Sequence, residues 1–253
     1  MSDLGQEAVD PATGINTVLL PFVVRIVRTE EHLQKAVAIR VKAYSRHLPE
    51  LASALRVPEP EDRSRSSLVL LAETKEGGEP IATMRIETNF DRPLGIEEVL
   101  RGRPQFAGRT IANVSRLGVA SGREGSLAKL TLFKALHRYC LATQVEWIVV
   151  GAKPPLDRQY ERLGFVDVES QGSLRTIPAS QGIPVRLLAL EVIAAEREWL
   201  KNQHPLYKFM CQDFTPDIQI FSSVSGMWAT PRRRVVEPPS DELLESVFGV
   251  SLV

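Results

Sequence analysis

The 253-residue sequence contains only two cysteines, Cys140 and Cys211, too few for a disulfide framework or a cysteine-based metal cluster. Its 31 basic residues balance its 31 acidic residues, and this zero net charge argues against a general nucleic-acid binder. No apolar run approaches the ~18–20 residues needed to cross a bilayer. No basic segment precedes the apolar run Val18–Leu20, so a secretory signal is not expected. These absences predict a folded cytoplasmic protein without a metal, a membrane span or a nucleic-acid partner.

Composition divides the chain into four parts. Residues 1–20 are polar and rich in turn formers, and we expect them to form a flexible arm. Residues 21–193 should form the core, and residues 194–228 a helical extension packed on it. In residues 229–253 a linker leads to a short helix with one apolar face, which needs a surface of its own chain or of a partner. A homodimer therefore remains open.

The core segments predict an α/β or α+β fold with a mixed sheet. Thr29 is placed to cap a helix whose apolar residues keep helical spacing as far as Tyr44. The charged, proline-containing stretch Pro58–Ser67 is expected to be exposed. Seven segments have strand composition: Phe22–Val27, Ser67–Ala72, Ile81–Glu87, Thr110–Val119, Trp147–Val150, Phe165–Val168 and Val185–Leu190.

One turn carries a possible binding function. Gly122 and Gly125 follow the strand that ends at Val119 and open directly into an apolar helix. Glycines allow positive φ and close backbone approach, and the first N–H groups of a helix suit a phosphate. Arg123 and Lys129 could add positive charge. The alternative is an ordinary turn that ends a strand.

Two stretches resemble the GNAT superfamily of N-acyltransferases. Arg116–Val119 followed by the turn and helix is similar to that superfamily's acyl-carrier-binding motif, although this loop has Arg-Glu between its glycines. Asp157–Phe165 resembles its second signature, a helix ending in a tyrosine-containing Leu-Gly-Phe turn. The resemblance implies a centrally splayed mixed sheet flanked by helices, and acyl-CoA or acyl-acyl carrier protein as donor. The residues it assigns to the carrier are Leu117, Val119, Gly122, Arg123, Gly125 and Ser126.

A narrower resemblance covers roughly residues 22–220. Ile81–Ile86 and Asn113–Val119 are similar to acyl-homoserine-lactone synthases and to long-chain N-acyl amino acid synthases, whose arginines match Arg85 and Arg116. Lactone synthases carry a glutamate where this chain has Asn113, which favours the amino acid synthases. The resemblance implies transfer of a medium or long acyl chain to the amino group of an amino acid or similar small amine.

Four residues are candidates for the chemistry, each with a structural alternative. Glu87 is the candidate general base, or a solvated carboxylate at a strand end. Tyr160 is the candidate acid for the departing thiolate, or a packing residue on the apolar side of a short helix. Arg85 and Arg116 lie within apolar strands, where an unpaired charge is costly. They could grip a substrate carboxylate, or pair with Glu87 or another carboxylate.

Two other functions remain open at this point. The first is an acetyl-CoA-dependent N-acetyltransferase of a small amine or a protein. The second is an acyl-thioester-binding domain without catalysis, because a fold does not determine a function. An acidic acyl carrier protein could dock on the basic side chains expected near the cleft, and their alternative is a solvated loop. These side chains are Arg101, Arg103, Arg109 and Arg123.

Overall fold

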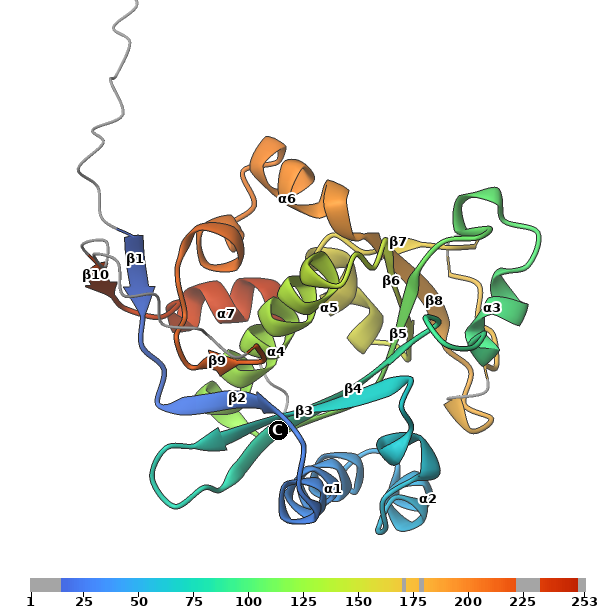
Figure 1. Cartoon of the computed structure of the whole chain (residues 1–253), viewed down its shortest axis with the longest axis horizontal. Helices are drawn as coiled ribbons and strands as arrows, with labels where there is room; N and C mark the ends of the chain where they lie inside the picture. The colour runs from blue at the N-terminus through green and yellow to red at the C-terminus, as the bar shows by residue number, and fades with distance from the viewer. Residues whose placement is uncertain (1–14, 170–171, 178–179, 222–232, 250–253) are drawn as a thin grey trace, which may run out of the picture.

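The computed structural model describes residues 15–169, 172–177, 180–221 and 233–249 (Figure 1). Its centre is an eight-stranded mixed sheet with the order β7-β8-β6-β5-β4-β3-β2-β9. Neighbouring strands are antiparallel except β5–β6 and β2–β9, which are parallel. The strands are β2 (Phe22–Ile26), β3 (Ser67–Thr74), β4 (Pro80–Thr88), β5 (Ile111–Val119), β6 (Trp147–Ala152), β7 (Val166–Asp167), β8 (Arg186–Glu191) and β9 (Ile218–Gln219).

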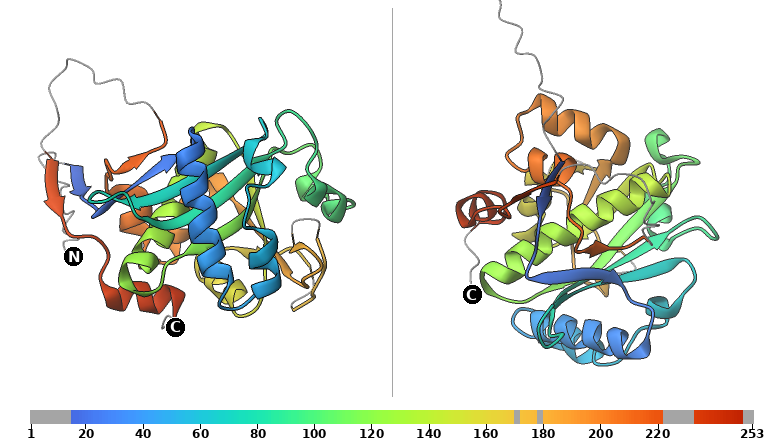
Figure 2. Two further views of the ribbon diagram at one scale, coloured as in Figure 1. Left: turned by 90° about the horizontal axis from the view of Figure 1, so that it is seen from below. Right: turned by 60° about the vertical axis from the view of Figure 1, so that its left-hand side comes forward.

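Helices cover both faces of this sheet (Figures 1 and 2). α1 packs across β3, β4 and β5 on one face, and α4 packs across β2 to β5 on the other, where the main apolar core lies. The helices are α1 (Glu30–Tyr44), α2 (Pro49–Ala54), α3 (Gly95–Leu100), α4 (Gly122–Ala142), α5 (Leu156–Arg162), α6 (Val192–Lys201) and α7 (Asp241–Phe248), with short helical turns at η1 (Pro60–Arg63), η2 (Pro104–Phe106) and η4 (Lys208–Gln212).

Local sequence signals account for α1. The Thr29 hydroxyl accepts a hydrogen bond from the backbone N–H of His32, as an N-cap residue does. Glu30 and Glu31 lie in the first turn, where negative charge suits the helix dipole. The predicted start of this helix is confirmed.

The sheet opens between β5 and β6. The two strands pair from Ile111 with Trp147 to Val114 with Val150 and no further, although β5 continues to Val119. The last five residues of β5 therefore diverge from β6 and leave a gap between two neighbouring strands. This splay, together with the flanking helices, confirms the predicted GNAT-like fold.

A β-bulge lies beside this gap. Thr83 pairs with Gly118 and Arg85 with Ser115, so Arg116 and Leu117 on β5 lie opposite one residue of β4. Arg116 has a φ of 56°, in the left-handed region, which costs a non-glycine residue about 1–2 kcal/mol. Leu117 has no register partner on β4 or on β6.

Both ends of the described chain pack against the core. Residues 15–20, which the sequence analysis assigned to an arm, are packed: β1 (Ile15–Val18) pairs in parallel with β10 (Arg233–Val236), and both Val18 and Leu20 are buried. Apolar burial therefore holds residues that polar composition assigned to an arm. Residues 1–14 lie outside the described part of the chain.

The helical extension after β8 is fixed by a buried lysine. Lys134 on α4 donates to the carbonyl oxygens of Phe209 and Asp213 and to the Thr215 hydroxyl, at 2.5–2.9 Å. Burial lowers the pKa of Lys134 to about 8. These contacts and the buried side chains of Leu206, Phe209 and Met210 hold the segment after α6 against α4.

The terminal helix α7 covers a surface of its own chain. Leu244, Val247 and Phe248 are buried, and α7 contacts both α4 and α5 (Figure 2). The sequence left open whether this helix covers its own chain or a partner, and in the structure it covers its own chain. A homodimer remains a prediction.

Candidate active site

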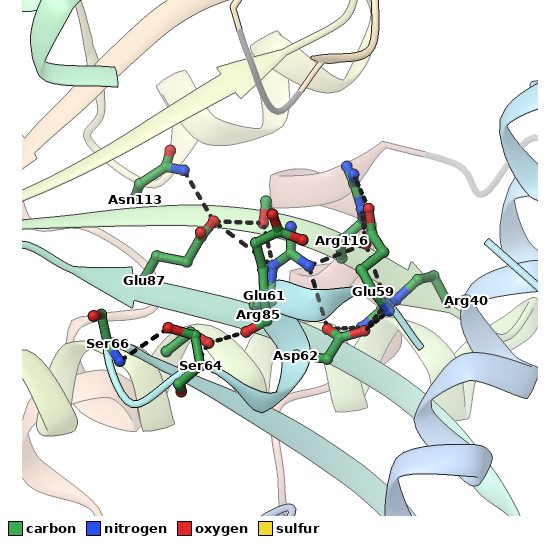
Figure 3. A network of polar contacts seen from close by, with 12 residues as sticks. Arg40, Glu59, Glu61, Asp62, Ser64, Ser66, Arg85, Glu87, Asn113 and Arg116 are labelled. Atoms are coloured by element: carbon green, nitrogen blue, oxygen red, sulfur yellow. Dashed lines mark hydrogen bonds and ion pairs between the residues drawn. The ribbon is translucent and has the colours of Figure 1, made fainter. Parts of the chain in front are cut away.

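Two strands, one helix and one loop meet in a buried group of charged side chains (Figure 3). The Arg116 guanidinium donates two hydrogen bonds of 2.6 Å to the carboxylate of Glu59. Arg85 donates to the same carboxylate at 3.0 Å and to Ser115 Oγ at 3.2 Å. Both arginines are thus engaged by one acid from the loop before η1.

A second acid, Asp62 of η1, completes the group and pairs with Arg40 of α1. Arg40 is fully buried and makes two hydrogen bonds of 2.9 and 3.0 Å to Asp62, which also lies 3.3 Å from Arg85. Burial alone would raise the pKa values of Glu59 and Asp62, but hydrogen bonds and charges from the arginines outweigh it and lower both. Three arginines thus face Glu59, Asp62 and Glu87, and their formal charges balance.

This arrangement corrects the expectation that Pro58–Ser67 is exposed. The side chain of Asp62 is fully buried, and that of Glu59 is 14% exposed. The sequence contained a usable signal, because arginines within apolar elements require carboxylates and this stretch holds three acids within four residues. Glu87, the one partner named in advance for Arg85 and Arg116, is only a secondary contact of Arg85.

A cavity of about 390 Å³ opens beside the group, between β4, β5 and the turn that leads to α3. We call it the polar cavity. Three carboxylates line it, from Glu59, Glu61 and Glu87, together with the basic side chains of Arg85, Arg92 and Arg116. Leu94, Ile96 and Ile177 supply apolar surface.

Glu87 is the least engaged carboxylate of the charged group. Its Oε2 lies 3.4 Å from both Asn113 Nδ2 and Ser115 Oγ and 3.6 Å from Arg85 Nε, all long distances. Its side chain lines the polar cavity and is 15% exposed. A carboxylate with weak contacts that faces a cavity can accept a proton from a bound amine. This location supports the prediction for Glu87 without testing it.

A second cavity of about 140 Å³ lies at the splay, and we call it the apolar cavity. It shares Arg116 and Ile177 with the polar cavity, so the two are adjacent. Ser115 and Lys153 also reach it from the diverging strands and the loop after β6. Most of its wall is apolar: Leu48, Leu51, Val114, Leu156, Ile183 and Val185.

The two tyrosines near the splay have different surroundings. Tyr160 is 2% exposed and packs edge-on against Phe133 and Phe165 at centroid distances of 5.4 and 5.3 Å, as its structural alternative predicted. Burial raises its pKa, so the hydroxyl stays protonated. Tyr44 on α1 lines the apolar cavity, and burial raises its pKa as well. The sequence argument did not single out Tyr44 for catalysis.

The glycine turn lies at the end of the diverging half of β5. Gly122 has a φ of +85°, and α4 begins at this residue. Ser121 accepts a hydrogen bond from Arg46, which the sequence argument missed, and Arg123 pairs with Asp241 of α7. Val119, Gly125 and Ser126 flank the turn, so the residues assigned to the carrier are contiguous with the splay. Whether they bind a phosphate remains a prediction.

Gly125 has a packing reason to be glycine. A Cβ there would lie 1.9 Å from the carbonyl oxygen of Ala120, whereas one at Gly122 would meet nothing within 4 Å. We expect Gly125→Ala to lower the free energy of unfolding by about 3 kcal/mol or more. Gly122→Ala should cost about 1–2 kcal/mol, through its positive φ alone. Urea denaturation of both variants checks the order, and an equal or smaller loss for Gly125→Ala would contradict it.

A splayed mixed sheet, a bulge beside the gap and a glycine turn that opens a helix define a GNAT-type fold. The family model for the N-acyl amino acid synthase FeeM matches residues 35–191, more than half of the chain. The chain belongs to this family and is an N-acyltransferase enzyme.

Solved structures share the fold. The structure of FeeM, an N-acyl amino acid synthase from uncultured soil microbes, is 19% identical with a TM-score of 0.55, over 75% of this chain and 98% of that one. BjaI, a CoA-dependent acyl-homoserine lactone synthase solved with SAM and isopentyl-CoA, is 17% identical with a TM-score of 0.53, over 89% and 98%. The search of curated proteins found no match. In the described ranges, no helix has the length and apolarity of a membrane span.

Proposed function

We propose that this protein is an N-acyl amino acid synthase. It transfers a medium or long acyl group from a pantetheine thioester to the α-amino group of an amino acid. The observation that carries the proposal is the pair of adjacent cavities, one polar and one apolar, which share Arg116 and Ile177 at the splay. A reaction that joins a charged amine to an acyl chain needs two such compartments side by side.

In this proposal, the carbonyl group of the acyl donor lies at the bulge of β5. The pantetheine arm enters through the gap between β5 and β6, with its phosphate at Gly122–Ser126 and the acyl chain in the apolar cavity. The backbone N–H around Leu117, which neither neighbouring strand pairs with, donates to the oxygen that becomes negative. Holding amine and thioester together contributes several kcal/mol to lowering the barrier.

The acceptor ammonium gives one proton to Glu87, and the free amine attacks the carbonyl carbon. The C–S bond breaks, its electron pair stays on sulfur, and the thiolate takes a proton from Tyr160. The nitrogen then gives its second proton to the Tyr160 oxygen, which restores the hydroxyl. The proton on Glu87 leaves to solvent. The products are an amide, a thiol and one proton.

Both donors, acyl-CoA and acyl-acyl carrier protein, are compatible with this route. Carrier protein would dock on the basic side chains named from the sequence. Arg123 lies at the glycine turn, whereas Arg109 lies just before the end of β5 that pairs with β6, away from the splay, and Arg101 is exposed. Three of them already have acidic partners: Arg103 with Glu169, Arg109 with Glu146 and Arg123 with Asp241. Docking on these three would compete with the existing pairs, so the proposed donor site depends on the gap rather than on them.

The test is an assay of the purified chain. The protein is incubated with acyl-CoA and acyl-acyl carrier protein donors from acetyl to palmitoyl and with a mixture of amino acids, and N-acylated products are identified by mass spectrometry. We expect products with medium or long chains. Turnover of acetyl donors alone would identify an acetyltransferase, and donor binding without any product would identify a non-catalytic domain.

Tyr160→Phe tests the proton donor within that assay. The change removes one hydroxyl and keeps the aromatic contacts, so we expect unchanged stability and a kcat lower by about 10²-fold. Tyr44→Phe is the matched comparison, because Tyr44 lines the apolar cavity. A larger loss for Tyr44→Phe would transfer the proton-donor role to that residue.

A further inference from the structure

The sequence left open whether Arg85 or Arg116 grips a substrate carboxylate or pairs with a carboxylate of the chain, and in the structure both arginines are engaged. Arg116 makes a bidentate pair with Glu59 at 2.6 Å, and Arg85 contacts Glu59 and Asp62. Their side chains are almost fully buried. A carboxylate that replaced Glu59 on either arginine would leave Glu59 as an unpaired buried charge, which is costly. The cation that holds an acceptor carboxylate must therefore be a different one.

Arg92 meets this requirement. It lies in the turn between β4 and α3, is exposed, and lines the polar cavity. Across the described ranges, the one polar contact of its side chain is a hydrogen bond of 3.4 Å to Ser64 Oγ. This long contact with a neutral hydroxyl leaves the planar guanidinium able to form two parallel hydrogen bonds with a carboxylate.

The polar cavity carries the complementary charge as well. The carboxylate of Glu87 lines the same cavity with only long contacts of its own. A free α-amino acid carries an ammonium and a carboxylate on one carbon, so it needs an acidic and a basic group on the walls of a single site. Glu87 and Arg92 form such a pair, whereas Glu59 and Asp62 are already engaged by the three buried arginines.

We propose that Arg92 holds the α-carboxylate of the acceptor amino acid, while its amino group faces Glu87 in the polar cavity. This inference rests on the proposed function and adds the residue that selects an amino acid over a simple amine. Arg92 binds and orients the acceptor through its carboxylate, and Glu87 accepts the proton of its ammonium group.

The test compares each amino acid acceptor with its carboxamide, which keeps the amine and loses the negative charge. For Arg92→Gln we expect the KM for the amino acid to rise about 10- to 100-fold, the loss of a charge-assisted hydrogen-bonded pair. The kcat, the donor KM and the kcat/KM for the carboxamide should change less than about threefold. Arg92→Lys should restore part of the affinity, because lysine supplies charge without the planar fork.

Arg65→Gln is the matched control. Arg65 is exposed, lies near Ser64 and does not line the polar cavity, so its loss should leave both acceptors unaffected. Thermal unfolding verifies that Arg92→Gln folds, which its exposure predicts. If the wild type prefers the amino acid and Arg92→Gln prefers it equally, the role of Arg92 is overturned and the proposed function stands. If the wild type itself ignores the carboxylate, the amino acid acceptor is overturned as well.

Discussion

Replacing Glu87 by glutamine is expected to lower kcat at neutral pH by about 10²- to 10³-fold, the range of a lost general base. Glutamine keeps the shape of the side chain and the contacts with Asn113 and Ser115, and it removes the ability to take a proton. The donor KM should not change, because Glu87 lines the acceptor side of the site. Steady-state kinetics with the preferred donor and acceptor measure this loss.

A pH profile separates a base from a residue that only supports the site. The fraction of the acceptor that arrives as free amine rises with pH, so at higher pH the reaction needs the base less. The deficit of Glu87→Gln should therefore shrink as the pH rises from about 7 to 9. Glu98→Gln, an exposed carboxylate on α3, is the control and should match the wild type. A deficit that stays constant across this range would argue against proton transfer to Glu87.

Glu59→Gln should have the largest effect on stability, a loss of about 3–5 kcal/mol in the free energy of unfolding. Glu59 is the shared partner of Arg116 and Arg85, whose side chains are 6% and 3% exposed. Without its charge, both guanidinium groups stay buried with less compensation. Urea denaturation measures the loss, and Glu50→Gln, at an exposed position on α2, should change stability by no more than about 0.5 kcal/mol. A loss below about 1 kcal/mol would show that the pairing contributes little.

The free energy of unfolding measured at acid pH tests the same group of ion pairs. Because the pKa values of Glu59 and Asp62 are lowered in the folded state, their stabilisation is complete above the ordinary carboxyl range. It is lost as the pH falls from about 5 through those lower folded values. The wild type should therefore lose more stability than Glu59→Gln over this interval. Parallel curves for the two proteins would contradict the assignment.

Much of this fold could be predicted from local patterns. The cap at Thr29, the strands and the glycine turn each depend on residues near one another in the chain, so their spacing alone indicates them. Two motifs in the right order, around Gly122 and around Tyr160, were sufficient for the GNAT resemblance. The family match over residues 35–191 confirms that interpretation.

The residues that make up the site were harder to predict from the sequence. Arg85 and Arg116 were recognised as arginines that must be paired, but Glu59 lies 26 and 57 residues before them. Its charged, proline-containing surroundings indicated an exposed loop, and only the packing of η1 against β3 reverses that expectation. Arg92 had no pattern of its own, because an arginine in a turn is ordinary until a cavity is found beside it.

The sequence by itself determined the elements, the glycine turn before α4 and the family, because these features are encoded by neighbouring residues and by motif spacing. Tertiary structure alone decided which carboxylate neutralises the strand arginines, where β5 leaves β6, and that Arg92 lines the polar cavity without a carboxylate partner among the described residues. The physical reason is that ion pairs and cavities depend on the register and packing of distant segments. A shift of one residue in a strand moves every side chain to the opposite face of the sheet.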